Sequence, residues 1–445
     1  MSKPRERNNE PVTVPFAATP AGKPPSIRDW AHPCVWTDRM LTTLEQGVRG
    51  GKWHTLIDKV YAPLNLFAAS SHVIGNQGAA GVDHQTVEGL QANRLKELDK
   101  LHEALRTNTY RPQAVRRVWI PKPGSTEQRP LGVPTVRDRV VQTALLHVLE
   151  PIFEATFLPV SYGFRHGRGC HHALERVEEL LRAGHVYVVD ADLKSYFDTI
   201  SKGRLMSRLC EKVSDNRVLR LVEMFLEQGV LDGLREWTPE AGTPQGAVMS
   251  PLLANIYLNP LDHALTDAGY AMVRYADDFV ILCKTREEAE AALALVQGWV
   301  NDNDLILHPT KTKIADARTE GFDFLGYHFR GDLRVPRQKS LKKLKDAVRE
   351  KTKRTNGHDL LFTCSRLSRQ LRGWFIYFRH CRGSVFRQLD GWIRGRLRSM
   401  LRRRQKRRGR GRGTDHQRWP NRFFDEHGLW SLQTAHIRFV QSSPR

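Results

Sequence analysis

Three aspartates stand at the ends of two apolar segments that are rich in β-branched residues. Asp192 lies near the end of the run His185–Leu193, and Asp277 and Asp278 interrupt the run Ala271–Cys283. The second run reads as a β-hairpin with its two acids at the tip. Carboxylates at strand ends are costly to bury unless a cation compensates them. Two Mg²⁺ ions would do so while clamping the attacking and leaving oxygens of a phosphoryl transfer. An isolated Asp-Asp pair is more often the solvated end of a strand, so neighbouring motifs must decide between the two.

The segments around these acids predict a mixture of helices and strands. Apolar residues recur at spacings of three and four along several stretches, and β-branched residues mark short extended ones. We expect helices at 56–73, 90–105, 137–157 and 172–182, and strands at 116–121 and 129–134. Further helical patterns at 340–353, 360–380 and 384–401 place most of their aromatic residues on one stripe. These patterns predict a small helical bundle whose solvent-exposed face is rich in arginine.

The positive charge of the chain is concentrated in one segment. Residues 331–412 contain 27 Lys and Arg against 5 Asp and Glu, an excess equal to the net charge of +22 of the whole chain. Within this segment, Leu401–Arg412 is a nearly continuous basic run. Such a run is often a solvated arm, but here it follows aromatic-rich helices, and a basic face on a bundle is a platform for backbone phosphates. The charge therefore predicts a polyanionic partner, with an acidic membrane surface as the weaker alternative.

Neither membrane insertion nor a disulfide or zinc framework is expected. No apolar run approaches the roughly 18 residues that a spanning helix needs, and Met1–Pro25 lacks the apolar core of a secretory signal. The six cysteines are scattered, without a Cys-x-x-Cys pair. This pattern indicates a reducing cytoplasm, where a basic protein of this kind would associate with the nucleoid.

Four motifs occur in order around the three acids. Asp192–Phe197 matches a DxxxxF box, Gly242–Gly246 reads Gly-Thr-Pro-Gln-Gly, Ser250–Asn255 reads Ser-Pro-Leu-Leu-Ala-Asn, and Tyr275–Asp278 reads Tyr-Ala-Asp-Asp. Together they resemble the polymerase motifs of reverse transcriptases. From about residue 55 onward the chain resembles the reverse transcriptase–maturases of bacterial group II introns. Further matches to that family lie at Asn76–Asp83, Ile120–Gly124, Arg129–Pro134, Ser161–Arg165, Phe324–Tyr327, Arg372–Trp374, Trp419–Phe424 and Gly428–Leu429.

The resemblance implies an α+β fold. It is a right-hand polymerase with fingers and palm, an α-helical thumb or maturase domain, and a small basic C-terminal tail. The implied division is an N-terminal extension at 1–50, fingers with an N-terminal RNA-binding block at 51–180, a palm at 181–332, the thumb at 333–400 and a DNA-binding tail at 401–445. The family offers no counterpart for the N-terminal extension.

The resemblance also implies a metal site. Asp192 and Asp277 would bridge two Mg²⁺ ions, for which Mn²⁺ can substitute, and the carbonyl of Leu193 would complete the ion on the nucleotide side. Asp278 is expected to have a weaker or one-metal role, because neighbouring strand residues face opposite ways unless a turn intervenes. Asp190 could share the face of Asp192, but the box places the ligand at Asp192 and implies a structural role for Asp190.

The pocket for the incoming deoxynucleotide follows from the same motifs. Phe197 takes the position of a steric gate, where a ring excludes a 2′-hydroxyl, with plain core packing as the alternative. Lys122 and Arg129 match finger residues that contact the triphosphate, where a cation offsets developing charge. Gln245 and Gly246 match the box that lines the pocket.

The other basic residues of interest are expected to contact nucleic acid or are left open. Arg165 is a weaker candidate for a template or nucleotide contact, and Lys311 either approaches the pyrophosphate or is a solvated lysine. The thumb residues predicted to bind nucleic acid are Arg372, Trp374, Arg394 and Arg398, and those of the tail are Arg402, Arg403, Arg404, Arg407 and Arg408. The resemblance favours RNA for the thumb and DNA for the tail.

The resulting prediction is an RNA-directed DNA polymerase that binds a group II intron RNA, assists its splicing and copies it into DNA during retrohoming. Its other partners would be a DNA target, a primer and deoxynucleoside triphosphates. A domesticated relative acting in DNA repair or defence without an intron is the alternative. A non-catalytic splicing factor is disfavoured by the intact acids.

The segment Ala247–Met249 replaces the family's usual Gly-Pro-Leu, and the endonuclease motifs of some members are absent. Because an enzyme without the endonuclease cannot cut the second DNA strand itself, its primer would come from a nicked strand or a replication fork. The oligomeric state is not predicted.

Overall fold

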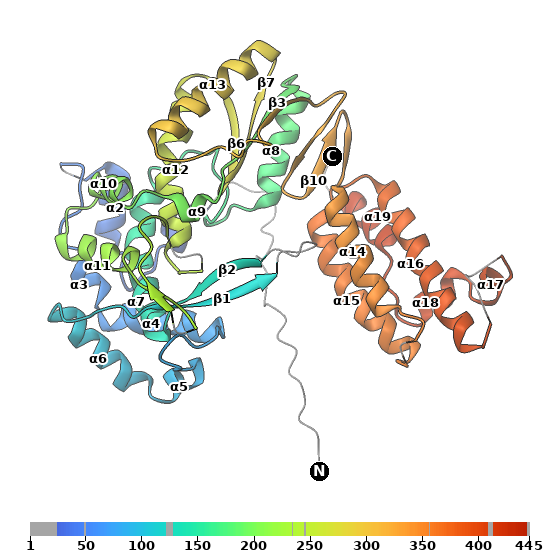
Figure 1. Cartoon of the computed structure of the whole chain (residues 1–445), viewed down its shortest axis with the longest axis horizontal. Helices are drawn as coiled ribbons and strands as arrows, with labels where there is room; N and C mark the ends of the chain where they lie inside the picture. Colours follow the sequence, from blue (N-terminus) through green and yellow to red (C-terminus); the bar gives the residue numbers. More distant parts are fainter. Residues whose placement is uncertain are drawn as a thin grey trace.

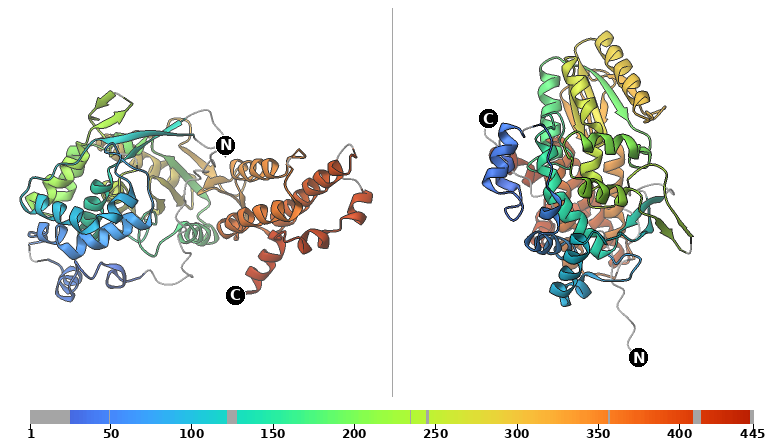
Figure 2. Two further views of the ribbon diagram at one scale, coloured as in Figure 1. Left: turned by 90° about the horizontal axis from the view of Figure 1, so that it is seen from below. Right: turned by 90° about the vertical axis from the view of Figure 1, so that its left-hand side faces the viewer.

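The computed structural model describes residues 25–48, 50–121, 128–233, 235–243, 246–355, 357–407 and 413–442. These residues form a larger lobe of helices and sheets and a smaller helical lobe, with a short three-stranded sheet between them (Figure 1). A perpendicular view shows the helical lobe projecting away from the rest of the molecule (Figure 2). None of the described helices combines the length and the apolar character needed to cross a membrane. The described part has the expected α+β architecture.

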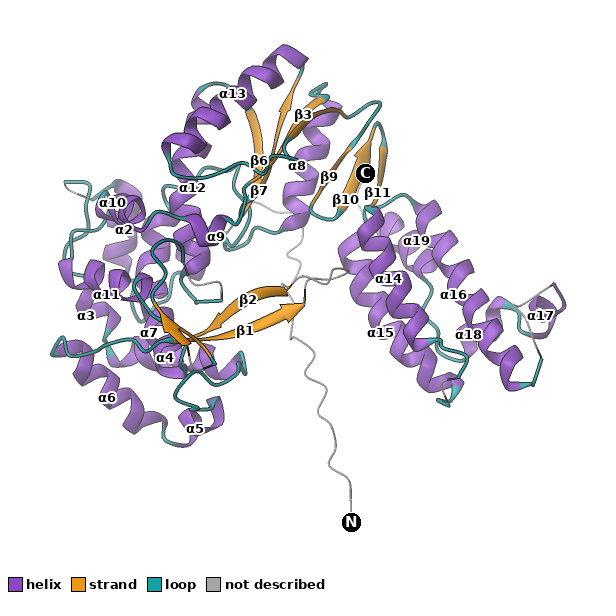
Figure 3. Cartoon of the chain, viewed as in Figure 1, coloured by secondary structure: helices purple, strands orange, loops and turns teal. Residues whose placement is uncertain are grey.

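The palm is a four-stranded antiparallel sheet in the order β6-β7-β3-β8. Because successive strand residues face opposite sides, Val189 and Ala191 of β3 enter one hydrophobic core and Val188 enters the other. Helix α13 covers the first face and α8 covers the second (Figure 3). These elements are β3 (Tyr187–Asp192), β6 (Ala271–Tyr275), β7 (Asp278–Cys283), β8 (Lys313–Asp316), α8 (Cys170–Arg182), α12 (Ser250–Asp267) and α13 (Arg286–Asp302).

The fingers combine helices around the buried α7 (Val136–Glu154) with a second sheet in the order β2-β1-β4-β5. Helix α4 (Pro63–Gly75) packs along α7. The single helix expected at 56–73 is divided, because Pro63 begins α4 after the short α3 (Ile57–Val60). The strands are β1 (Val115–Pro121), β2 (Gln128–Val133), β4 (Val230–Asp232) and β5 (Arg235–Trp237), and the other helices are α5 (Val87–Ala92), α6 (Arg94–Arg106), α9 (Tyr196–Thr199), α10 (Lys202–Cys210) and α11 (Asn216–Leu226).

Residues 25–48 pack onto the fingers and do not form a separate extension. Helices α1 (Ile27–Trp30) and α2 (Asp38–Gln46) flank Trp36, which enters the core around α7. The Trp36 indole N–H donates to the carbonyl of His147 at 2.9 Å. The boundary predicted at residue 50 is therefore wrong for this segment. Its core side chains, Ala31, Val35, Trp36 and Leu41, are distributed over two short helices and the turn between them, so no single long helical stripe marks them. The first 24 residues lie outside the described part.

The contact between this segment and α7 predicts a protein that loses stability in acid. His147 is buried, its ring stacks on that of His32 with centroids 4.5 Å apart, and its Nδ1 lies 2.8 Å from Asn65 Oδ1. Burial, and then the neighbouring His32 and His72, lower the pKa of His147 from 6.5 to about 3. The unfolded chain therefore binds a proton between these pH values that the folded chain does not. The contribution of His147 to stability is complete above pH 6.5 and declines as the pH falls toward 3.

We expect this proton to reduce the free energy of unfolding by about 2 kcal/mol between pH 7.5 and pH 5. In His147→Gln that part of the pH dependence should disappear, because no ring is left to protonate in the unfolded chain. Urea unfolding of both proteins at the two pH values measures the difference. Identical pH dependences would show that His147 is not the titrating group.

The helical lobe follows the small antiparallel sheet β11-β10-β9. Its core is built from the stripe of apolar residues predicted from the sequence, which includes Leu367, Leu371 and Phe378. The lobe is attached to α8 by a hydrogen bond from His171 Nε2 to the carbonyl of Tyr377 at 2.8 Å. The strands of the small sheet are β9 (Phe322–Phe324), β10 (Tyr327–Arg330) and β11 (Leu333–Pro336). The helices of the lobe are α14 (Gln338–Lys351), α15 (Leu360–Phe378), α16 (Gly383–Arg404), α17 (Gly413–Arg418), α18 (Asn421–Glu426) and α19 (Leu432–Ser442).

Three predicted boundaries fall inside continuous elements. The division between 180 and 181 lies in α8, the division between 332 and 333 lies in the β10–β11 hairpin, and the division between 400 and 401 lies in α16. The described tail packs into the bundle: Phe424 and Leu432 are fully buried in its core, and the Asp390 carboxylate accepts the N–H of Leu432 at 3.1 Å. The basic run begins before α16 ends, and high charge alone does not mark the end of a packed helix.

Candidate active site

The three predicted acids meet at one end of the palm sheet. Asp192 is the last residue of β3 and stands directly opposite Asp278, the first residue of β7. Asp277 lies in the turn between β6 and β7, where Ala276 takes a φ of 59°. Directly opposed residues of antiparallel strands project from the same face. Asp192 and Asp278 therefore share a face, and the turn lets Asp277 lie beside them.

The carboxylates at this end of the sheet shift one another's pKa. Burial, followed by the charges of Asp190, Asp277 and Asp192, raises the pKa of Asp278 to about 7. Burial also raises the pKa of Asp277, with a further contribution from Asp192. The pKa of Asp190 is raised to about 6, again mainly by burial. The site thus concentrates more negative charge than the protein alone stabilises, and a divalent cation would relieve it.

This arrangement fits metal ions that are shared with a substrate. Among the described residues, no three His, Cys, Asp or Glu side chains converge closely enough to enclose an ion. Mg²⁺ typically keeps several waters and binds one or two carboxylates together with substrate phosphates. An open set of carboxylate oxygens is the ligand set that such shared coordination requires.

Lys311 lies at the same acids. Its ammonium donates to Asp192 Oδ2 at 2.5 Å, and the neighbouring N–H of His308 donates to the Asp192 carbonyl at 2.7 Å. Of the two possibilities left open by the sequence, the structure favours a lysine at the site over a solvated one. Asp190 is close enough to raise the pKa of Asp278, but its expected structural role stays a prediction.

The residues predicted to contact the nucleotide are only partly described. Phe197 is half-buried in α9, and its carbonyl accepts the N–H of Thr243 at 2.8 Å. Arg129 is exposed on β2, and its charge lowers the pKa of Asp277 against the effect of burial. Gly246 is described, whereas Lys122 and Gln245 lie outside the described residues.

Close backbone contacts explain the two glycines of the Gly-Thr-Pro-Gln-Gly box. Gly242 and Gly246 take φ values of 92° and 103°, which residues with side chains rarely adopt. A Cβ at Gly242 would lie 2.7 Å from the carbonyl oxygen of Phe197, and one at Gly246 would lie 2.6 Å from that of Gly132. These two glycines therefore pack directly against the backbone of Phe197 and against a finger strand.

Most described residues of the predicted nucleic-acid surface are exposed or half-buried in the helical lobe. Trp374 is half-buried and packs on Phe378, with ring centroids 4.7 Å apart. Arg394 and Arg402 are mostly covered and form ion pairs with Asp425 and Asp415. Those exposed are Arg372, Arg403, Arg404 and Arg407, and Arg408 lies outside the described residues.

The predictions for Arg398 and Arg165 are wrong. Arg398 is 2% exposed and donates to the Trp419 carbonyl at 2.9 Å, because α16 turns that face toward the packed tail. Arg165 is 4% exposed and donates to both oxygens of Glu154 at 2.7–3.0 Å. Neither guanidinium is available to a template or nucleotide, and each stabilises the fold from within.

Arg274, a second buried arginine, which lies next to the acids, was not identified from the sequence. Arg274 lies on β6 directly before the Tyr-Ala-Asp-Asp box and contacts Asp262 and Asn255 of α12. The available signal was a single charge inside the otherwise apolar strand Ala271–Tyr275. A charge there must be paired if the strand is buried.

Comparison with known proteins agrees with this geometry. The family "Reverse transcriptase (RNA-dependent DNA polymerase)" matches residues 120–329, and "Group II intron, maturase-specific domain" matches residues 341–419. Protein YkfC of Escherichia coli K12 is 36% identical over 314 residues, a match that covers 61% of this chain and 82% of YkfC. The chain belongs to the group II intron reverse transcriptase–maturases. As a reverse transcriptase of this family it is an RNA-directed DNA polymerase, and the family generally uses divalent metal ions.

Other relatives of this reverse transcriptase match smaller parts. The group II intron-encoded protein LtrA of Lactococcus lactis subsp. cremoris is 38% identical over 198 residues, which cover 44% of this chain and 32% of LtrA. The chain thus matches about a third of the length of LtrA. A chain of the partial Cas6-RT-Cas1–Cas2 complex is 26% identical, with 56% of this chain and 42% of that chain covered and a TM-score of 0.37.

Proposed function

We propose that this reverse transcriptase binds a group II intron RNA, assists its splicing and copies it into DNA during retrohoming. The observation that carries the proposal is the meeting of Asp192, Asp277 and Asp278 at the open end of a palm sheet. The exposed arginines of the helical lobe support a large RNA partner, because they form a basic surface on a packed bundle. Such a protein would work in the cytoplasm, in association with the nucleoid.

The metal site follows from the donor set. Asp192 and Asp277 would hold two Mg²⁺ ions, with Asp278 on one of them and the Leu193 carbonyl on the nucleotide side, and Mn²⁺ can substitute. When bound, the ions stabilise the attacking and leaving oxygens of nucleotide addition. The chain itself orients the carboxylates through the β3–β7 register.

The other residues act on the primer and the deoxynucleoside triphosphate. Arg129 would offset charge on the triphosphate, and Lys311, which donates to Asp192, would meet the departing pyrophosphate. Phe197 borders the sugar, beside the loop that contains Gly246. The DNA target would be held by the basic end of α16 and the residues that follow it, and intron RNA by the remainder of the helical lobe.

Sequencing the RNA that co-purifies with the protein tests the intron assignment. Enrichment of one structured intron, and faster splicing of that RNA when the protein is added, would support it. Binding without enrichment of any intron, combined with active polymerisation, would instead point to a domesticated enzyme of repair or defence. Intron binding without polymerisation would leave only the splicing role.

The basic surface predicts a strong dependence of RNA binding on salt. Replacing Arg372, Arg403 and Arg407 together by Gln should reduce the slope of log affinity against log salt by about 2, at roughly 0.7–0.9 for each lost phosphate contact. All RNA sequences should be affected alike, because phosphate contacts do not read bases. Filter-binding titrations on intron RNA and on duplex DNA measure the slopes and show which ligand depends more on these residues.

A matched triple variant controls for the loss of charge. Arg176, Arg220 and Arg286 are also exposed, but they lie outside the helical lobe and are paired with glutamates. Their replacement by Gln should leave the slope nearly unchanged. Equal slopes for the wild type and the first variant on both ligands would mean that these arginines make no phosphate contacts and are only exposed to solvent.

A further inference from the structure

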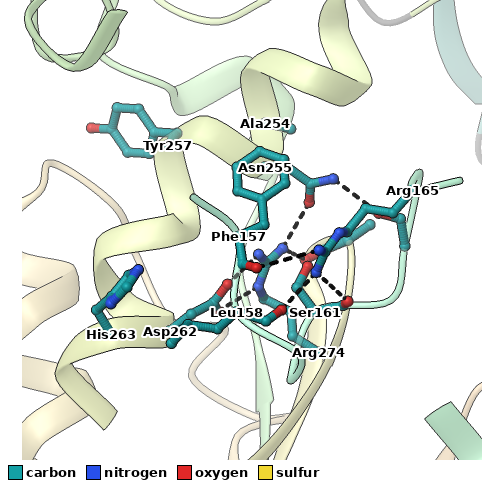
Figure 4. A network of polar contacts seen from close by, with 12 residues as sticks. Phe157, Leu158, Ser161, Arg165, Ala254, Asn255, Tyr257, Asp262, His263 and Arg274 are labelled. Atoms are coloured by element: carbon teal, nitrogen blue, oxygen red, sulfur yellow. Dashed lines mark hydrogen bonds and ion pairs between the residues drawn. The ribbon is translucent and has the colours of Figure 1, made fainter. Parts of the chain in front are cut away.

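A fully buried ion pair lies beneath the turn that carries Asp277 (Figure 4). Arg274 of β6 and Asp262 of α12 are both 0% exposed. The arginine donates from Nε to Asp262 Oδ1 at 2.6 Å and from Nη2 to Asp262 Oδ2 at 2.5 Å. This bidentate geometry fixes the guanidinium in one plane and one position.

The third guanidinium nitrogen reaches the turn itself. Arg274 Nη1 donates to the carbonyl of Ala276 at 3.0 Å and to Asn255 Oδ1 at 2.9 Å. Ala276 has a φ of 59°, a left-handed conformation that costs energy in a residue with a side chain. A hydrogen bond to its carbonyl from a fixed donor opposes relaxation of that strained peptide, and Asp277 is the next residue.

The same network supports the turn from the opposite side. Asn255 Nδ2 donates to the carbonyl of Gly163 at 2.9 Å. A Cβ at Gly163 would lie 2.3 Å from the backbone nitrogen of Ala276, so the loop is pressed against the turn. The N–H of Tyr162 donates to the Arg274 carbonyl at 2.8 Å. Helix α12, the loop after α7 and the β6–β7 turn are therefore locked together.

We propose that Arg274, Asp262 and Asn255 form a positioning network that sets the geometry, and thereby the metal affinity, of Asp277 and Asp278. None of the three is proposed to touch substrate or metal. Buried ion pairs contribute little net stability on average, because desolvation offsets their attraction, but breaking one is costly. Here the pair delivers a rigid donor to the one strained carbonyl next to the metal-binding acid. The inference rests on the proposed metal-dependent polymerisation.

Arg165 provides a matched control within the same region (Figure 4). It too is buried and bidentate, with its Nε and Nη2 on Glu154, and it donates to the carbonyls of Leu158 and Ser161 at 2.6 and 2.8 Å. The partners of its guanidinium lie in the segment 154–161, whose Ser161 pairs with Arg274 through the backbone. Arg165→Lys leaves the side-chain contacts of Arg274 in place and should therefore affect the acids less than Arg274→Lys does.

The test compares Arg274→Lys with Arg165→Lys. The lysine keeps the buried charge but cannot hold Asp262 and the Ala276 carbonyl together. In Arg274→Lys we expect primer extension at fixed Mg²⁺ to fall by about tenfold to hundredfold, and the metal concentration for half-maximal rate to rise by about tenfold. Affinity for the RNA–primer duplex should stay within about twofold, because the basic surface is untouched. Hydrogen exchange of the peptide spanning 272–283 should accelerate in the metal-free protein.

A milder variant keeps the proposal testable if Arg274→Lys does not fold. Asn255→Ala leaves the ion pair intact and removes one support of the turn, so it should raise the half-saturating Mg²⁺ concentration by a smaller factor. Its effect should not add to that of Arg274→Lys, since both act on one turn. Unchanged metal dependence and unchanged exchange at 272–283 in folded Arg274→Lys or Asn255→Ala would overturn the proposal. Inactivity of the wild type would reject the polymerase function instead, while the exchange measurement would still test the network.

Discussion

Asp277→Asn should abolish extension of a DNA primer on an RNA template and leave RNA binding nearly intact. The substitution preserves the size of the side chain but removes the charge that would bridge the metal ions. Ion-mediated stabilisation of the reacting oxygens contributes several kcal/mol, and about 1.4 kcal/mol is tenfold in rate, so the loss should be about a thousandfold or more. Asp192→Asn should behave in the same way, because Asp192 stands opposite Asp278 at the same end of the sheet.

A carboxylate on the same sheet but away from its acidic end serves as the control. Asp316 is at the end of β8 and pairs with Arg318, so Asp316→Asn should retain primer extension close to the wild-type rate. Filter binding on the same RNA verifies that each variant still binds. Near-normal extension by Asp277→Asn or Asp192→Asn would remove these acids from the catalytic site.

Phe197→Ala should admit ribonucleotides. The backbone of Phe197 contacts the loop that contains the Gly-Thr-Pro-Gln-Gly box, its ring is half-buried, and removal of the ring would open space for a 2′-hydroxyl. Rejection of one hydroxyl by shape is worth about tenfold to hundredfold. We therefore expect the ratio of kcat/KM for dNTP over rNTP to fall by about that factor, mainly through a gain for the ribonucleotide. Single-nucleotide extension with each nucleotide measures the ratio.

A variant of the adjacent Tyr196 distinguishes a steric gate at Phe197 from a role in core packing. Tyr196 is fully buried, and its hydroxyl donates to the Ala254 carbonyl at 2.7 Å. Tyr196→Phe should lower stability slightly and leave sugar discrimination unchanged. If Phe197→Ala loses stability but keeps the wild-type ratio, the ring belongs to the core alone.

The acidic site was predictable because each of its parts has a local signal. The β-branched runs that become β3, β6 and β7 alternate between two cores, and Asp192 and the pair after Ala276 interrupt them where the strands end. The helical bundle was predictable for the same reason, since its apolar stripe has helical spacing. These sequence patterns do not specify the register between β3 and β7, and it is this register that places Asp192 opposite Asp278.

Long-range pairing explains the failures. Arg398 and Arg165 are indistinguishable from exposed arginines in sequence, and only the folded chain reveals their partners, such as Glu154 for Arg165. Arg274 and Asp262 meet through hydrogen bonds between a strand and a preceding helix, a contact that helical or strand periodicity does not encode. Residues 25–48 are anchored by side chains of two short helices and the turn between them, among them Trp36, so their docking escapes a search for long periodic patterns.

The most direct test of the central claim is primer extension by the purified wild-type protein on an RNA template, with deoxynucleoside triphosphates and Mg²⁺. The structure and the family predict an alkali-resistant DNA complementary to the RNA, formed only when a divalent ion is present and not formed by Asp277→Asn. Absence of any DNA product with both Mg²⁺ and Mn²⁺, from protein that binds the template and primer, would contradict the claim.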